Sequence, residues 1–432
     1  MANASHAEVY QSLSAECSFL DENQRLWWHS TAPMFAHMLQ SAEYMQQSQR
    51  QHLEIYKKVV IPMLGVYPVE DRPRWMSILT RYGTPFELSL DCSKNIVSYT
   101  YEPISLMTGT AHDPYNTNAI WEALHHLEVY QPGINLEWFS YFKEALTLTS
   151  EESALLLKNN NLVGDQIKTQ NKLSLQLDKG DDFNLKVYIY PALKSLVTKR
   201  STQDLIFEAA HKLTSLYPTV TISTPLKVLE EYLKSRAPNS TVKPRFLSCN
   251  LVEPSKSRIK IYLLEEQVTL TTLEDLWTLG GRRNDESTLE GLKILQELWD
   301  LINLTSKFCT YPVGYLSFND TVKEQLPLLA GYTIHPDDPY PEPEIYFQTF
   351  GHRDQKLSKA LMTFFQQQGW TKIAQSYEKD LRAWYPMADF KRLNKIHTLV
   401  SFSYRDKSPS VNVNLQSFET GEWDMCRSSP NL

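Results

Sequence analysis

Lysine, arginine and tyrosine alternate along two segments of the chain in a way that suits the binding of a multiply charged anion. The segment LKVYIYP has a Lys-x-Tyr-x-Tyr pattern and RIKIYLL has an Arg-x-Lys-x-Tyr pattern, which together contain Lys186, Tyr188, Tyr190, Arg258, Lys260 and Tyr262. Residues two apart on a strand share one face. Closely spaced Lys and Arg suit phosphate groups, and tyrosine rings can stabilise a carbocation and keep water from it. The patterns therefore indicate a departing diphosphate beside an allylic cation, which is the chemistry of prenyl transfer.

The two segments belong to hairpins that recur along the chain. PFELSLDC and VSYTYEPI alternate apolar and polar residues on either side of the turn-like SKN, and this pattern predicts a β-hairpin. Four more such pairs follow, each preceded by two segments of helical periodicity, and the predicted strands span residues 85–92, 97–104, 172–178, 185–191, 245–252, 258–264, 328–334, 344–350, 397–404 and 410–418. The first helix is expected to have Pro33 in its first turn, with Ser30 or Thr31 as its cap.

Ten antiparallel strands are near the practical limit of an open twisted sheet, and closure of the sheet removes its exposed edges. We therefore expect an α+β fold in which five ααββ repeats form a ten-stranded antiparallel β-barrel, with the helices outside, as a single domain of residues 1–432. About eight strands enclose just enough room for side chains, so ten should leave a ligand cavity. The alternative is two separate α+β domains with solvated polar strand faces.

Composition and missing motifs exclude several classes of protein. The 432 residues carry a net charge of −7, whereas a nucleic-acid binder usually has a basic surplus. The five cysteines are scattered, and no spacing typical of a zinc site appears. No run approaches 18 apolar residues, and the amino-terminal residues lack the apolar segment of a secretory signal. We therefore expect a cytoplasmic protein that binds neither nucleic acid nor membrane.

Several segments together make the chain similar to a known family. They are GTPFELSL with VSYTYEPI, HDPYNT, QNKLSLQL with LKVYIYP, SRIKIY, LGGRR and PEPEIYF. In these segments the chain resembles the fungal aromatic prenyltransferases of the dimethylallyltryptophan synthase family, from about Trp27 to Phe418. The resemblance implies the same ten-stranded barrel and a metal-independent Friedel–Crafts alkylation. The expected partners are an allylic diphosphate, with dimethylallyl diphosphate preferred, and an aromatic small molecule. No cofactor or metal is expected, which agrees with the lack of a DDxxD motif.

The resemblance also implies roles for individual residues. Glu87 resembles the acidic residue that accepts the indole N–H, and Lys172 resembles the lysine that takes the ring proton. The positions that match the diphosphate-binding and shielding set are Lys186, Tyr188, Arg258, Lys260, Tyr262, Glu344 and Tyr346. Positions that match the cation shield and acceptor pocket are Tyr190, Ser98, Thr100, Leu329 and Asn414. Leu329 falls where a bulky residue limits the length of the prenyl chain.

Three positions depart from the family pattern. Ser98 stands where Arg is common, Glu344 where Gln is common, and Asn414 where a shielding Tyr is common. The first change removes a cation from the diphosphate site, and the other two make the cavity more polar.

Tryptophan, a Trp-containing cyclic dipeptide or another indole would fit as the acceptor, in the biosynthesis of an indole alkaloid. Two alternatives stay open. One is a prenyltransferase of phenolic or polyketide aromatics, and the other is a non-catalytic barrel that binds a phosphorylated lipid. A homodimer is compatible with the sequence.

Overall fold

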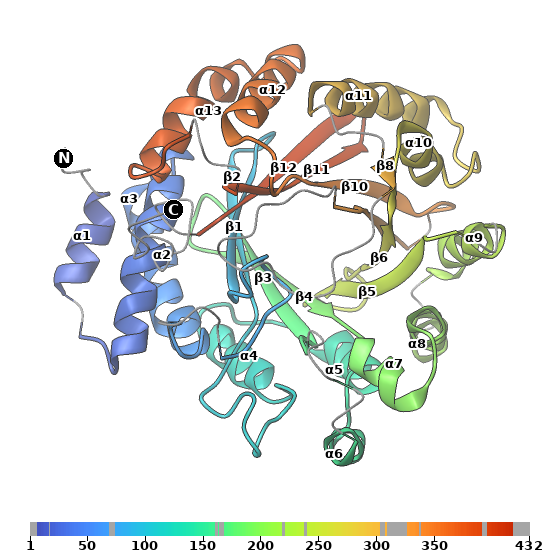
Figure 1. The fold of residues 1–432 in the computed structure, drawn as a ribbon, viewed down its shortest axis with the longest axis horizontal. Helices are drawn as coiled ribbons and strands as arrows, with labels where there is room; N and C mark the ends of the chain where they lie inside the picture. Colours follow the sequence, from blue (N-terminus) through green and yellow to red (C-terminus); the bar gives the residue numbers. More distant parts are fainter. Residues whose placement is uncertain are drawn as a thin grey trace.

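Ten strands form one closed antiparallel barrel at the centre of the molecule, and helices surround it (Figure 1). The computed structural model describes residues 7–16, 18–68, 74–159, 163, 168–217, 221–236, 240–302, 307–308, 326–336, 338–390 and 395–417. The barrel strands are β1 (Phe86–Asp91), β2 (Ile96–Tyr101), β3 (Asn171–Leu177), β4 (Phe183–Ile189), β5 (Lys243–Asn250), β6 (Ile259–Glu265), β9 (Leu328–Ile334), β10 (Glu342–Gln348), β11 (His397–Arg405) and β12 (Ser408–Leu415). The predicted ten-stranded barrel is confirmed, and the strands make one sheet rather than two.

The sheet closes between the first and the last strand. Around the barrel the order is β1-β12-β11-β10-β9-β6-β5-β4-β3-β2, and Leu88 of β1 lies opposite both Leu415 of β12 and Tyr99 of β2. The strands turn most of their apolar residues outward against the helices, and the outward-facing Leu88, Tyr99 and Leu415 are fully buried there. The polar residues between them consequently face the barrel interior.

The helices cover the outside of the barrel, mostly in pairs between hairpins (Figure 1). They are α1 (Glu8–Ala15), α2 (Glu22–Ser41), α3 (Gln46–Ile55), α4 (Ala119–Glu128), α5 (Glu137–Leu146), α6 (Ser150–Lys158), α7 (Ala192–Thr198), α8 (Thr202–Leu216), α9 (Ser223–Lys234), α10 (Leu270–Thr278), α11 (Glu286–Ile302), α12 (Asp354–Gln367) and α13 (Thr371–Trp384). The repeats are therefore less uniform than expected: α1, α6 and α7 are additions, as is a small sheet of β7 (Gln267–Val268) and β8 (Lys307–Phe308).

The expected start of the first long helix was wrong. Helix α2 begins at Glu22, where Asp21 caps it by accepting a hydrogen bond from the Gln24 N–H at 2.9 Å. Pro33 lies well inside this helix instead of in its first turn. A proline inside a helix removes one backbone hydrogen bond. Here the surrounding residues, including Trp28 and Phe35, are fully buried, so tertiary packing sustains the helix through the proline.

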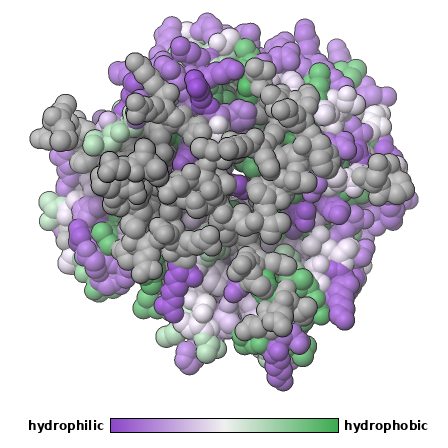
Figure 2. Space-filling view, viewed as in Figure 1, coloured by the Kyte–Doolittle hydropathy of each residue, from purple (hydrophilic) through white to green (hydrophobic). Residues whose placement is uncertain are grey.

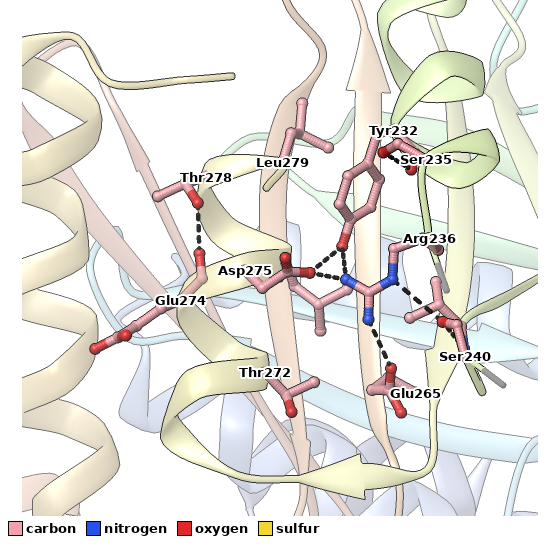
Figure 3. A network of polar contacts seen from close by, with 12 residues as sticks. Tyr232, Ser235, Arg236, Ser240, Glu265, Thr272, Glu274, Asp275, Thr278 and Leu279 are labelled. Atoms are coloured by element: carbon pink, nitrogen blue, oxygen red, sulfur yellow. Dashed lines mark hydrogen bonds and ion pairs between the residues drawn. The ribbon is translucent and has the colours of Figure 1, made fainter. Parts of the chain in front are cut away.

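A polar network outside the barrel joins α9 and α10 to the end of β6 (Figure 3). The Arg236 guanidinium bonds Asp275 of α10, lies 3.6 Å from Glu265 of β6, and donates to Ser240 Oγ at 3.1 Å. The Tyr232 hydroxyl donates to Asp275 at 2.6 Å, and its ring centroid is 5.4 Å from the guanidinium. One arginine thus ties three elements together.

The LGGRR segment follows this network as a loop. Leu279, Gly280 and Gly281 have φ angles of 52°, 64° and 81°, a left-handed run that glycine adopts readily. Arg282 donates back to the Leu279 carbonyl at 3.1 Å and to Ser235 at 2.9 Å, and Arg283 donates to the Pro341 carbonyl at 2.8 Å. The arginines of this motif therefore hold the loop and do not form a phosphate cradle.

We expect Arg236→Ala to lower the free energy of unfolding by about 2 kcal/mol, because it leaves Asp275 and the buried Glu265 without their cation. Urea denaturation measures this change. Arg382→Ala is the matched control, since Arg382 forms a surface ion pair with Glu378 at 2.8 Å, and exposed pairs contribute about 0–1 kcal/mol. Equal changes in the two variants would contradict a special role for the network.

Candidate active site

The barrel contains a cavity of about 580 Å³ that reaches the end where the β11–β12 and β1–β2 turns lie. Its lining comes from the inward faces of several strands and from the turns at that end, and includes Lys186, Asn250, Arg258, Lys260, Thr333, Glu344, Ser403 and Arg405. The predicted ligand cavity is therefore present. Most of the cations predicted from the alternating pattern gather at this one end.

Lys186 and Lys260 point into the cavity from β4 and β6, whereas Arg258 lies directly before β6 and is exposed at its rim. Burial lowers the pKa of Lys186 to about 8; the nearby Lys260 and Arg258 also lower it, and Glu344 opposes them. Such crowding of like charges is costly unless an anion occupies the space between them. This end of the cavity is suited to a polyanion.

Glu344 shares this space with the cations. Its carboxylate pairs with the Lys260 ammonium inside the barrel. Burial pushes the pKa of Glu344 upward, but the attraction of Lys260 and its hydrogen bond outweigh burial, and the pKa is lowered overall. Glu344 therefore stands ionised, and it competes with any bound anion for Lys260.

A continuous row of aromatic rings runs along the interior wall from the cations toward the other end. Phe246 stacks on Tyr190 with ring centroids 4.5 Å apart and on Tyr262 at 4.3 Å. Tyr262 also lies 5.8 Å from Tyr188 and 6.0 Å from Tyr346. Electron-rich ring faces of this kind stabilise a neighbouring cation. The predicted tyrosines are brought together, and Phe246 completes the row.

Gly331 makes room for the lysine in this wall. It faces Tyr262 on β6 and Glu344 on β10. A Cβ atom at this glycine would lie 2.3 Å from Lys260 Cε and 3.2 Å from the rings of Tyr262 and Tyr346. Any side chain at residue 331 would therefore displace Lys260.

Glu87 lies at the opposite end of the barrel, on β1, and its two carboxylate oxygens are held separately. Oε1 accepts from the Thr398 hydroxyl at 2.6 Å, and Oε2 accepts from the Asn414 amide at 2.8 Å. Burial raises the pKa of Glu87, while these two hydrogen bonds and Lys172 oppose the rise. Asn414 thus contacts the acidic residue directly, a partner that the sequence did not indicate.

Lys172 of β3 approaches the same region. Its ammonium lies 5.0 Å from the Tyr188 ring centroid and 5.2 Å from that of Tyr190. Burial lowers the pKa of Lys172 to about 8, with Glu87 and Glu102 opposing the shift. An amine with such a pKa is partly neutral near pH 8 and can accept a proton.

The remaining predicted positions lie on two separate parts of the wall, Ser98 and Thr100 on β2 and Leu329 on β9. Thr100 lies opposite Glu87 and donates to Ser174 Oγ at 3.1 Å. Ser98 lies opposite Ser89 of β1 and Gln176 of β3. Leu329 lies opposite Tyr346. Ser98 does not line the cavity that holds Lys186 and Lys260, and its role in the diphosphate site stays a prediction.

Within the part of the chain that the structure describes, no group of three or more His, Cys, Asp or Glu residues could hold a metal ion. Among the same residues, no helix combines the length and the apolar character needed to cross a bilayer. The coloured part of the face in Figure 2 is mainly hydrophilic, with scattered hydrophobic patches.

Comparison with known proteins assigns this arrangement to a family. The family described as tryptophan dimethylallyltransferase matches residues 23–380. The chain belongs to the tryptophan dimethylallyltransferase family.

Relatives within this family match over nearly the full chain. Tryptophan dimethylallyltransferase ifgA of Penicillium roqueforti (strain FM164) is 53% identical over 421 residues, which cover 98% of this chain and 90% of the relative. Tryptophan dimethylallyltransferase of Arthroderma otae is 54% identical over 421 residues, which cover 98% of this chain and 94% of the relative. The crystal structure of AnaPT from Neosartorya fischeri has a TM-score of 0.85 at 27% identity. The match covers 96% of this chain and 99% of AnaPT. The chain is thus a prenyltransferase, as predicted.

Three residues of the barrel interior escaped the sequence prediction. Phe246 was overlooked because it is apolar, and apolar strand residues were expected to face the helices. Thr398 was overlooked because β11 shifts register between His397 and Leu399. Gly331 has no side chain, so its contribution is visible only once its neighbours are placed. For Phe246, the alternation of Phe246, Ser248 and Asn250 with apolar residues was a signal that could have found it.

Proposed function

We propose that this prenyltransferase transfers a dimethylallyl group from dimethylallyl diphosphate to the indole ring of tryptophan or a tryptophan-derived acceptor. One observation carries the proposal: cations line a cavity at one end of the barrel, Glu87 is held on the inner face of the same barrel toward its other end, and a row of aromatic rings lies on the interior wall. The relatives named tryptophan dimethylallyltransferase support this choice of donor and acceptor.

The first step breaks the C–O bond between the allyl group and the diphosphate, and the electron pair leaves with the diphosphate. Lys186 and Lys260 stabilise the developing charge inside the barrel, where charge stabilisation is most effective, and Arg258 adds its charge from the rim. The row formed by Tyr188, Tyr262 and the other rings faces the allylic cation and protects it from water.

In the second step the π electrons of the indole ring form the new C–C bond to the cation. Glu87 accepts a hydrogen bond from the indole N–H, so it stabilises the positive charge that develops on the ring. Lys172 in its neutral form then removes the proton from the substituted ring carbon, and the ring recovers its aromaticity. The proton ends on Lys172 and the diphosphate is released.

A product screen tests this function directly. Purified enzyme is given donors of five, ten and fifteen carbons, each with a panel of indoles and phenols, and products are identified by mass spectrometry. Prenylated indole from the five-carbon donor is the expected result. Turnover on phenols alone would support the polyketide or phenolic alternative. Donor binding without turnover on any aromatic would support the non-catalytic barrel.

Activity is expected to be independent of added metal. The inward Lys and Arg residues can provide the counter-charge that magnesium supplies to diphosphates elsewhere. Assays with excess EDTA should therefore retain substantial turnover. Complete loss of activity in EDTA that magnesium restores would contradict this view of the diphosphate end.

Ser98→Arg should tighten the binding of dimethylallyl diphosphate by about tenfold, since a charge-assisted hydrogen bond contributes about 1.5–3 kcal/mol when well placed. Ser98 lies opposite the small Ser89 and is itself only partly buried. Ser98→Gln is the matched control, because it adds similar length without charge. Weaker or unchanged binding in Ser98→Arg would show that the donor does not approach β2.

We further propose that residues 1–432 act as one catalytic domain. The homodimer and the cytoplasmic location stay predictions, which sedimentation of the purified protein and cell fractionation would test.

A further inference from the structure

A buried cluster of Asp354, His397 and Tyr377 lies outside the cavity, next to the start of β11. All three side chains are essentially inaccessible to solvent. One oxygen of Asp354 accepts from the backbone N–H groups of Lys395 and Ile396 at 3.0 and 3.2 Å. The other accepts from the His397 N–H at 2.9 Å and lies 2.7 Å from His397 Nδ1. His397 Nε2 lies 3.1 Å from the Tyr377 hydroxyl.

These contacts fix the backbone where β11 begins. A carboxylate that accepts several N–H groups forms strong, directional hydrogen bonds. Thr349 adds two contacts from the end of β10: its hydroxyl donates to the His397 carbonyl and its N–H to the Thr398 carbonyl, each at 3.1 Å. The segment that leads into Thr398 is thereby held by α12, α13 and β10 together.

The same point of β11 is irregular. His397 pairs with Leu415 and Leu399 with Asn414, so Thr398 is an extra residue in the ladder. Extra residues of this kind redirect a side chain and are common beside active sites. Here the redirected hydroxyl of Thr398 reaches Glu87 Oε1 at 2.6 Å. The orientation of the Glu87 carboxylate therefore depends on where the backbone of residue 398 lies.

We propose that Asp354 and His397 are positioning residues for prenyl transfer, which act through Thr398 to aim the Glu87 carboxylate at the acceptor N–H. This inference rests on the proposed function, because it needs an acceptor that presents an N–H. A misplacement of about 1 Å can cost an enzyme as much as 100-fold in rate. Neither residue contacts the cavity, so their effect on turnover must pass through Glu87.

A double-mutant cycle with two acceptors tests the inference. Asp354→Asn keeps the shape of the side chain but removes one of its two acceptor oxygens. Thr398→Val removes only the hydroxyl, and Thr398→Ser retains it. Each is combined with Glu87→Gln and assayed with dimethylallyl diphosphate and either tryptophan or 1-methyltryptophan, which has no indole N–H. Asp285→Asn is the control for the same substitution at another hydrogen-bonded aspartate, since Asp285 accepts from the Thr288 N–H at 3.0 Å and is not among the residues that line the cavity.

We expect Asp354→Asn and Thr398→Val each to lower kcat on tryptophan by about tenfold, the effect of one lost hydrogen bond to a charged group. The KM for dimethylallyl diphosphate should stay unchanged, and Thr398→Ser should restore turnover. Neither change should lower turnover on 1-methyltryptophan, or add to the loss already caused by Glu87→Gln. Asp285→Asn should leave kcat unchanged.

Three outcomes would overturn the inference alone: losses that multiply with Glu87→Gln, equal losses on both acceptors, or Thr398→Val with full activity. Should Asp354→Asn fail to fold, the Thr398 variants still decide the matter. Wild-type enzyme that turns over no indole acceptor would instead overturn the proposed function, and this inference with it.

Discussion

Glu87→Gln should lower turnover on tryptophan by about 100-fold, because loss of one preorganised charge contact in the transition state typically costs that much. The substituted amide can still fill the site. Its carbonyl can accept from Thr398, and the Asn414 amide can rotate to present its oxygen to the new NH2 group. The structure therefore predicts a loss of chemistry with little loss of packing, since the negative charge that stabilises the developing indole cation is gone.

Steady-state kinetics and thermal unfolding of the same preparation separate the two effects. The KM for dimethylallyl diphosphate should be unaffected, because Glu87 does not line the cavity that holds Lys186 and Lys260. A large drop in melting temperature with unimpaired turnover in the folded fraction would mean that Glu87 only holds the wall together. Unchanged turnover and stability would indicate an acceptor without an N–H, such as a phenol.

Turnover should rise with pH through about 8 and depend on Lys172. Burial lowers the pKa of Lys172 to about 8, and only the neutral amine can accept the ring proton. The rate constant kcat therefore increases as Lys172 loses its proton. Lys186, whose pKa burial also lowers to about 8, must be protonated to bind the diphosphate. The ratio kcat/KM for the donor should consequently fall above about pH 8, and its profile should be bell-shaped.

Lys172→Met removes the amine and keeps the apolar stem, so it should lower kcat by about 100-fold and abolish the rising limb of the kcat profile. The falling limb of kcat/KM for the donor should persist, because Lys186 is untouched. Lys179→Met is the comparison, since Lys179 also has a pKa lowered by burial to about 8 but donates to the Asn95 carbonyl outside the cavity. A rising limb that survives in Lys172→Met would assign the base to water or another group.

Local patterns in the sequence predicted the barrel and most of its interior. Alternation with a period of two follows directly from strand geometry, so Glu87, Lys172, Lys186 and Tyr346 could be assigned to the inner face without knowledge of the neighbouring strands.

The partners of these residues could not be predicted in the same way. The ion pair of Lys260 with Glu344 joins residues 84 positions apart, and Asn414 reaches Glu87 across 327. Both contacts depend on which strands become neighbours, and that is decided by packing of the whole sheet. Pro33 shows the opposite situation. The local preference of proline for the first turn of a helix predicted a helix start there, but burial of the residues around it stabilises a helix that continues through Pro33.

Closure of the barrel through β1 and β12 also bears on how the protein is made. During synthesis β1 cannot pair with β12 until the last strand has been made, since Leu88 lies opposite Leu415. Contacts between such distant residues form slowly, because the entropy of closing a long loop is lost before any contact is gained. Until then β1 presents an unpaired edge that can join another chain. Glu87 acquires Thr398 and Asn414 in the same event, so a nascent or truncated chain has no working acceptor end, and catalytic competence appears only with the completed fold.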